Sequence, residues 1–63
     1  MLHENPRVVA LVVDALVIQA RVEGMKAENA HRAVTTGGVS YGEDAFCSAA
    51  DELVGIANAL RQV

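Results

Sequence analysis

Cysteine is nearly absent from this chain. With Cys47 as the single cysteine, no disulfide can form within one molecule. A domain of 63 residues lies near the lower limit for a hydrophobic core that is stable by itself, and such domains commonly depend on disulfides, metals or oligomerisation. One cysteine also suits the reducing environment of the cytoplasm. The scarcity of cysteine therefore leaves helix packing, a metal or association between chains as sources of stability.

Large aromatic anchors and positive charge are scarce as well. The chain has no tryptophan, only 3% aromatic residues, and a 52% hydrophobic composition in which Ala and Val dominate. Such a chain packs through the close approach of small side chains. Five Lys and Arg residues against eight Asp and Glu residues give a net charge of −3. Because a nucleic-acid binder needs a basic stripe to neutralise phosphates, we expect no direct binding to DNA or RNA.

The chain also lacks an apolar run long enough to cross a membrane. Residues 8–18 carry only one charge, Asp14, but Gln19 and Arg21 follow, and a membrane span needs about 20 apolar residues. Residues 1–6 have neither the basic opening nor the small-residue cleavage site of a signal peptide. We therefore expect no membrane association and a cytoplasmic location.

A first helix is predicted over residues 6–35. Asn5 can cap the free amide groups of the first turn, and Pro6 is well tolerated at the first helical position. Gly37 and Gly38 permit the left-handed backbone that ends a helix. The apolar residues between these signals recur at alternating spacings of three and four, which is typical of a helix packed along one seam. This seam consists of Val8, Leu11, Ala15, Ile18, Val22, Met25 and Asn29.

A second helix is predicted over residues 41–62. Ser40 followed by Glu43 has the spacing of a capping box, in which the serine caps the helix and the glutamate bonds back to it. Glu43 and Asp44 also place negative charge in the first turn, where the helix dipole favours it. The same spacing of three and four follows, at Phe46, Ala49, Leu53, Ile56, Leu60 and Val63.

A turn over residues 36–40 would fold the second helix back on the first. The expected fold class is therefore all-α, an antiparallel hairpin of two helices that forms a single domain over residues 1–63. Because the first helix is the longer one, its first two or three turns should extend beyond the second helix. These turns contain residues 8–18, which are apolar nearly all the way round.

Such a surface calls for a partner, because two helices bury little area. We expect two hairpins to associate into a four-helix bundle. The alternative is that the same surface docks into a groove on a foreign protein. A polar residue on a seam often fixes the register between helices, which is the role expected of Asn29. The expected interface residues are Val9, Leu11, Val12, Val13, Leu16 and Asn29.

The residues with chemical potential form no recognisable catalytic or metal motif. Glu28 and His31 have the spacing used in di-iron bundles, but the second motif and the additional core carboxylates are missing. No base is placed beside Cys47 by the sequence, so a small apolar filler or a surface thiol is the simpler interpretation. We expect no enzymatic activity, no metal and no cofactor. An enzyme or metal protein built in the bundle core is the third and least favoured class.

Two glycines leave an alternative open. Gly24 and Gly55 lie inside the predicted helices, where glycine costs about 1 kcal/mol relative to alanine. In an antiparallel hairpin they fall at similar depths from the turn. Either the two backbones approach each other closely there or the glycines are simply tolerated.

Acidic residues on the second helix permit two interpretations. They could form an acidic face that imitates nucleic-acid phosphates and occupies a basic groove on a target. The simpler interpretation is a solvated helix face whose charges match the helix dipole, since a net charge of −3 is modest for a mimic. The four residues concerned are Glu43, Asp44, Asp51 and Glu52.

One resemblance bears on function. Val22–Arg32 and Tyr41–Phe46, with a short glycine-containing gap between them, resemble small uncharacterised reading frames of tailed phages and prophages. The resemblance does not extend to residues 8–18. It implies an accessory protein made early in infection that acts by binding a host protein. Phage anti-CRISPR proteins, which are small, often acidic and stoichiometric inhibitors, are one such group.

These observations lead to two function hypotheses. The leading one is a small phage-type protein that inhibits or redirects a host complex by surface occlusion, of which an anti-CRISPR is the sharpest version. The alternative is a structural module that forms homodimers or assemblies and has no inhibitory target. The expected partners are therefore a second copy of the chain, a host protein complex, or both.

Overall fold

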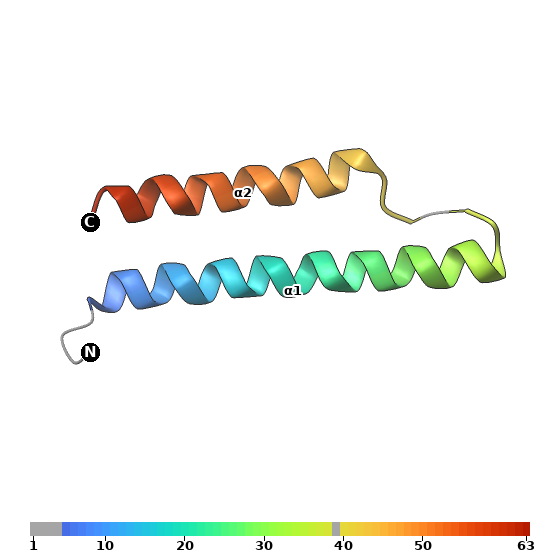
Figure 1. Ribbon diagram of the computed structural model, residues 1–63, viewed down its shortest axis with the longest axis horizontal. Helices are drawn as coiled ribbons and strands as arrows, with labels where there is room; N and C mark the ends of the chain where they lie inside the picture. The colour runs from blue at the N-terminus through green and yellow to red at the C-terminus, as the bar shows by residue number, and fades with distance from the viewer. Residues whose placement is uncertain (1–4, 39) are drawn as a thin grey trace.

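The computed structural model describes residues 5–38 and 40–63, which form two α-helices, α1 (Pro6–Thr35) and α2 (Glu43–Arg61). The helices run side by side in opposite directions, and the end of α2 lies beside the start of α1 (Figure 1). The described residues contain no strand. This arrangement confirms the predicted all-α helical hairpin. The expectations for residues 1–4 and for position 39 of the turn lie outside the described residues.

Helix α1 has the ends that its sequence predicts. The side-chain oxygen of Asn5 accepts a hydrogen bond of 2.8 Å from the backbone N–H of Arg7, and Pro6 opens the helix. At the other end, the N–H groups of Thr36 and Gly37 both donate to the carbonyl oxygen of Arg32. Gly37 has a φ of 81°, a left-handed conformation that glycine adopts without the strain a Cβ atom would cause.

Helix α2 does not begin as predicted. Its N-cap is Gly42, no side chain caps it, and the capping box expected from Ser40 and Glu43 is therefore wrong. The reason lies in α1, where the side-chain oxygen of Asn29 accepts hydrogen bonds from the N–H groups of Ser40 and Tyr41. These bonds hold both residues in the loop, so the helix starts at Glu43. Glu43 and Asp44 still lie in the first turn, as the helix dipole favours.

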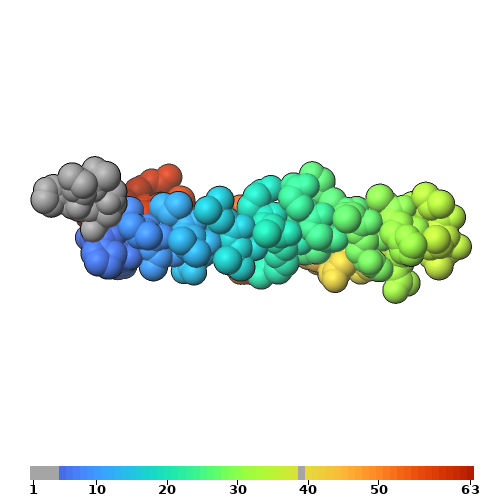
Figure 2. All heavy atoms as spheres, turned by 90° about the horizontal axis from the view of Figure 1, so that it is seen from below, coloured from blue at the N-terminus to red at the C-terminus, as the bar shows by residue number. Residues whose placement is uncertain are grey.

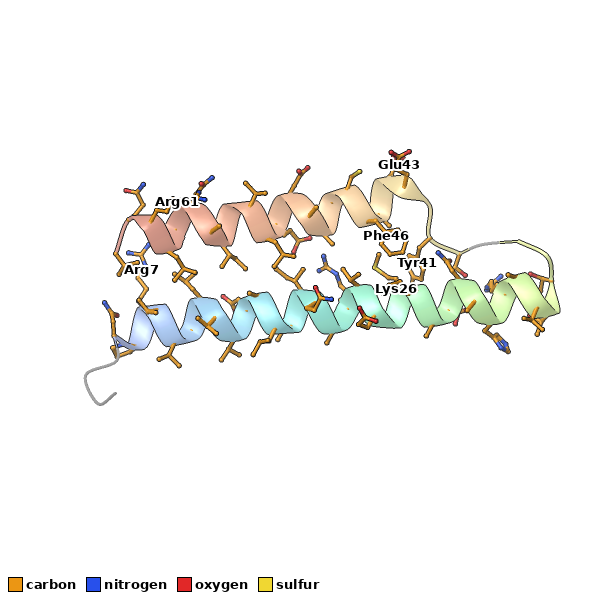
Figure 3. The ribbon with its side chains drawn as sticks, in the orientation of Figure 1. Arg7, Lys26, Tyr41, Glu43, Phe46 and Arg61 are labelled. Atoms are coloured by element: carbon orange, nitrogen blue, oxygen red, sulfur yellow. The ribbon has the colours of Figure 1, made fainter. Side chains whose placement is uncertain are left out.

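The predicted seam packs the two helices together. Ile18, Met25 and Ala49 are buried, and the remaining seam residues of α1 are half-buried. On α2, only Val63 departs from the expectation, because it follows the end of the helix and is exposed. Phe46 and Tyr41 point from the second half of the chain toward α1, whereas Glu43 points away from it (Figure 3).

The overhang lies at the opposite end of α1 from the one expected. Ala30–Thr35 are exposed on all sides, whereas the first turns of α1 face the end of α2 (Figure 1). The prediction of an N-terminal overhang is therefore wrong. The connection between the helices runs back along α1, because Asn29 binds Ser40 and Tyr41, and α2 consequently starts well before the end of α1.

The molecule is long and thin, with extents of 50 × 21 × 10 Å. Neither helix in the described part of the chain is sufficiently long and apolar to cross a membrane. Because the molecule has this shape, few side chains are buried. Among the described residues, only Ile18, Met25 and Ala49 are buried. Each helix therefore has one side that touches its neighbour and one side that does not.

Candidate interaction surface

The side of α1 that faces away from α2 carries large apolar side chains. Leu16 is 63% exposed, whereas Ile18, two residues further along the same helix, is 7% exposed. Two residues correspond to about 200° of rotation around a helix, so these side chains lie on nearly opposite sides. Figure 2 looks onto the exposed side, where α1 forms a continuous ridge along the molecule. We call this surface the outer apolar face; it comprises Val9, Val12, Val13, Leu16 and Val17.

Four of the six residues expected at an interface belong to the outer apolar face. These are Val9, Val12, Val13 and Leu16. Sequence reasoning missed Val17, which is 62% exposed. It belongs to the same apolar run as the four expected residues, which is the signal that could have identified it, and it lies next to the groove between the helices.

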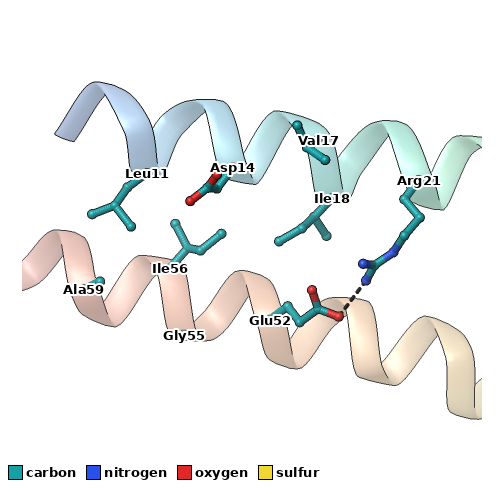
Figure 4. Close-up of a pocket in the computed structure, with 9 residues that line it drawn as sticks. All are labelled: Leu11, Asp14, Val17, Ile18, Arg21, Glu52, Gly55, Ile56 and Ala59. Atoms are coloured by element: carbon teal, nitrogen blue, oxygen red, sulfur yellow. Dashed lines mark hydrogen bonds and ion pairs between the residues drawn. The ribbon is translucent and has the colours of Figure 1, made fainter. Parts of the chain in front are cut away.

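The other two expected interface residues make contacts within the hairpin. Leu11 is half-buried and projects toward Ile56 and Ala59 of α2 (Figure 4). Asn29 is half-buried at the other end of the seam, where its side-chain nitrogen donates to the carbonyl oxygen of Tyr41 at 2.8 Å. With its two accepted bonds, the Asn29 amide is engaged by the loop of its own chain.

An open groove runs along one flank of the hairpin between α1 and α2 (Figure 4). Its floor is apolar, and small residues on the α2 side leave it wide. Its volume of about 470 Å³ falls in the range of small-molecule pockets, but it encloses little because one side is open to solvent. The groove is lined by Leu11, Asp14, Val17, Ile18, Arg21, Glu52, Gly55, Ile56 and Ala59.

An ion pair closes one end of the groove. The Arg21 guanidinium donates a hydrogen bond of 2.6 Å to a carboxylate oxygen of Glu52. This hydrogen bond, and secondly the negative charge of Glu52, raise the pKa of Arg21 above its ordinary value. Both side chains are about half exposed, so the pair orients the helices more than it stabilises them.

The four carboxylates expected to form an acidic face are spread around α2. Glu43 and Glu52 are nine residues apart, about two and a half turns, and therefore lie on opposite sides of the helix. Glu52 faces Arg21 of α1. Asp44 and Asp51, seven residues apart, share the side that points away from α1, and neither forms an ion pair with another described residue. Together with Glu43, which also points away from α1 (Figure 3), these two aspartates make up the outward acidic surface.

The residues with metal-binding or nucleophilic potential lie apart from one another. Glu28 accepts a hydrogen bond of 3.1 Å from Arg32, and His31 is exposed. Within residues 5–38 and 40–63, no three His, Cys, Asp or Glu residues are grouped so that they could hold a metal ion. Cys47 is exposed and free.

The two helical glycines do not mark a close approach within the hairpin. A Cβ atom at Gly24 or Gly55 would have no atom of the other helix within 4 Å. Of the two interpretations left open by the sequence, tolerance is the one that fits the isolated hairpin. At Gly55 the missing side chain widens the groove.

Comparison with known proteins adds no relative. No protein-family model, curated protein or solved structure matches this chain. The function must therefore be inferred from the distribution of apolar and charged side chains over the two helices.

Proposed function

We propose that this chain is a protein-binding module that acts through the outer apolar face of α1. The single observation that carries the proposal is the exposure of five large aliphatic side chains on one side of one helix. Scattered apolar residues are normal on a protein surface, but a contiguous patch is typical of a contact with another protein. Binding would supply the burial that the hairpin alone does not achieve.

The partner that the geometry supports best is another copy of the chain, which makes the protein an assembly module. A domain of this size, with three buried residues among those that the structure describes, gains little stability from its own core. Association of two hairpins would cover the outer apolar face of both at once, because a twofold axis brings the same patch of each copy together.

The second candidate function is inhibition of a host complex by surface occlusion, with an anti-CRISPR as its sharpest form. The resemblance of residues 22–46 to phage accessory proteins supports it. Asp44 and Asp51 add a structural reason, because each lies two residues, about 200° around the helix, from a position of α2 that packs toward α1, Phe46 or Ala49, and both are exposed. They would stay accessible to a basic surface on a target even when the outer apolar face is covered.

Replacement of Leu16 by aspartate tests the proposal. Leu16→Asp places a charge at the centre of the outer apolar face, which opposes burial but leaves the seam with α2 intact. Val54→Asp is the matched control, because Val54 is 56% exposed and lies on α2, outside the outer apolar face. Circular dichroism on both variants establishes that the helices persist.

The two variants are compared by light scattering and by retention of bacterial lysate proteins on the immobilised chain. We expect the wild-type chain and Val54→Asp to associate, and Leu16→Asp to lose association with its own copies and with any retained protein. A wild-type chain that is monomeric and retains nothing would overturn the proposal. Equal behaviour of Leu16→Asp and Val54→Asp would overturn it as well.

A further inference from the structure

A second seam runs along the side of α1 that does not touch α2. Starting from Val9, positions spaced alternately by four and three follow one side of the helix to its last turn, and every one of them is exposed. The spacing is that of a helix packed against another helix along its whole length. We call this series the outer seam; it consists of Val9, Val13, Leu16, Ala20, Glu23, Ala27, Ala30 and Val34.

The side chains of the outer seam are sorted by size along the helix. The first three, up to Leu16, are large and aliphatic, and alanines dominate the part beyond them. Val34 ends the series with another large side chain, which is 86% exposed. A partner that fits this face must offer small residues opposite Val13 and Leu16 and large residues opposite Ala27 and Ala30.

We propose, as a refinement of the protein-binding function, that the occupant of the outer seam is α1 of a second copy running antiparallel to the first. In antiparallel packing, seam positions of one type face those of the other type across the interface. Pairing the two types of position in this way sets one register. In it, Val9 lies against Val34 of the second copy, Val13 against Ala30 and Leu16 against Ala27. Each contact occurs twice about a twofold axis.

This register uses nearly the whole helix. Each of the three pairs has residue numbers that sum to the same value, so the twofold axis crosses α1 between residues 21 and 22. That point is close to the middle of α1, Pro6–Thr35, and the two helices therefore overlap over almost their full lengths. The same register thus places Val13 and Leu16 opposite alanines and gives the two helices almost complete overlap.

Parallel pairing of the same faces fits poorly. Identical seam positions face each other in a parallel pair, so Leu16 would meet Leu16 and Ala27 would meet Ala27, which leaves one half crowded and the other half loose. Glu23 would also lie against Glu23 of the other copy, and like charges at such contacts are destabilising. In the antiparallel register Glu23 faces Ala20, and the helix dipoles oppose each other favourably.

The local contacts of Glu23 suit its position on the outer seam. Its carboxylate accepts a hydrogen bond of 3.2 Å from Lys26 and one of 3.1 Å from Gln19 on the same helix. Gln19 and Lys26 both lie on one flank of the outer seam, so they draw the Glu23 carboxylate toward that flank. The one charge in the series is thus neutralised beside the seam instead of being buried in it.

The overhang of α1 gives independent support for this occupant. Ala30–Thr35 stay helical beyond the region that α2 covers, although they are exposed on all sides. Propagation of a helix without tertiary contacts is marginal in water. In the antiparallel pair, the overhang of each copy lies against the first turns of the other, where the outer apolar face is.

The exposed area is of the size that such a contact needs. The accessible surface of the chain is 4541 Å², whereas a compact monomer of 6.6 kDa would expose about 3,900 Å². The chain therefore exposes roughly 600 Å² more than a compact monomer would. Each partner in a standard interface buries about 800 Å², which is of similar size. Association through the outer seam would bring the exposed area per chain toward that of an ordinary small domain.

Disulfide formation between introduced cysteines tests the orientation and the register. All variants carry Cys47→Ser, which removes the native thiol without touching the seam, since Cys47 is exposed. Val13→Cys and Ala30→Cys are prepared separately, oxidised alone and as a mixture, and analysed on non-reducing gels. Val54→Cys on α2, mixed with Val13→Cys, is the matched control for random collision.

We expect a fast disulfide-linked dimer only in the mixture of Val13→Cys with Ala30→Cys. Val13→Cys alone would cross-link rapidly in a parallel pair, and this result would overturn the proposal. Cross-linking of the control mixture at the same rate, or of no sample at all, would overturn it too, because a disulfide requires Cβ atoms about 4 Å apart.

Failure of this inference can be told apart from failure of the protein-binding function. If the chain forms a dimer that Leu16→Asp abolishes, but the cross-links do not follow the antiparallel register, the function stands and the inferred geometry is wrong. If the chain is a monomer at every concentration, the second copy is not the occupant. In that case, retention of lysate proteins that depends on Leu16 would still support binding to a foreign partner.

Discussion

Asn29 and Tyr41 are joined by two hydrogen bonds between one side-chain amide and one residue of backbone. The Oδ1 atom of Asn29 accepts from the N–H of Tyr41 at 2.9 Å, and its Nδ2 atom donates to the carbonyl oxygen of Tyr41 at 2.8 Å. Oδ1 also accepts from the N–H of Ser40 at 3.0 Å. One polar residue of the seam thereby determines where α2 begins and how far α1 extends beyond it.

Replacement of Asn29 by alanine should therefore loosen the loop. Each of the three hydrogen bonds contributes about 0.5 to 1.5 kcal/mol, and water can replace part of this because the site is half-exposed. We expect the free energy of unfolding to fall by about 1 to 2 kcal/mol, measured by urea titration. Asn58→Ala is the control, because Asn58 accepts only from Arg61 on its own helix. Equal losses in the two variants would contradict the tethering role.

Leu11→Asp should disrupt the hairpin itself. Leu11 is half-buried against α2, so an aspartate there has no hydrogen-bonding partner in the seam and a desolvation cost. Circular dichroism should show a large loss of helix at all protein concentrations. In Leu16→Asp, by contrast, the helical signal of the isolated hairpin should persist. A stable, helical Leu11→Asp chain would place Leu11 on a free surface.

Gly37→Ala should destabilise the end of α1. Gly37 has a φ of 81°, and an L-residue pays roughly 1 to 2 kcal/mol in the left-handed region. The neighbouring change Gly38→Ala is the control, because Gly38 does not have a positive φ and the new Cβ atom would meet only Thr36 at 3.9 Å. Thermal unfolding should separate the two variants. No difference between them would mean that the chain beyond Thr36 can end α1 in another way.

The Arg21–Glu52 ion pair should show a defined response to salt and pH. Because the pKa of Arg21 is raised in the folded chain, its contribution to stability is fully present below the ordinary arginine pKa and is lost only as pH rises beyond it. We expect the difference in melting temperature between the wild-type chain and Arg21→Gln to be small and constant between neutral pH and pH of about 10.

Added salt should reduce that difference, because both side chains are about half exposed and their attraction is screened. Lys26→Gln is the matched control, since it removes an exposed ion pair within α1 and not one between the helices. A difference for Arg21→Gln that grows with salt or disappears near pH 9 would show that the pair is not the source of the effect.

The local features of this fold were accessible from the sequence. Asn5 and Pro6 start α1, and Gly37 ends it, because capping and left-handed backbone depend on neighbouring residues alone. The seam between the two helices was predictable for a similar reason, since a periodic spacing determines which residues share a side of a helix. Ile18, Met25 and Ala49 are buried where this spacing placed them.

The start of α2 and the end at which α1 overhangs were not accessible in the same way. Ser40 and Glu43 have the spacing of a capping box, but Asn29, eleven residues earlier, binds the backbone that the box would need. A contact between residues that distant along the chain depends on the path of the loop. Local propensity at Ser40 contains no information about that path.

The candidate interaction surface was likewise predictable only in part. The sequence by itself determined that α1 is apolar nearly all the way round near its start, because composition and helical period suffice for that conclusion. Only the tertiary structure decided which side of α1 meets α2 and which is left exposed, so that Leu11 faces inward and Leu16 outward. The physical reason is that a helix with several apolar sides can bury any of them, and the choice depends on where the second helix is held.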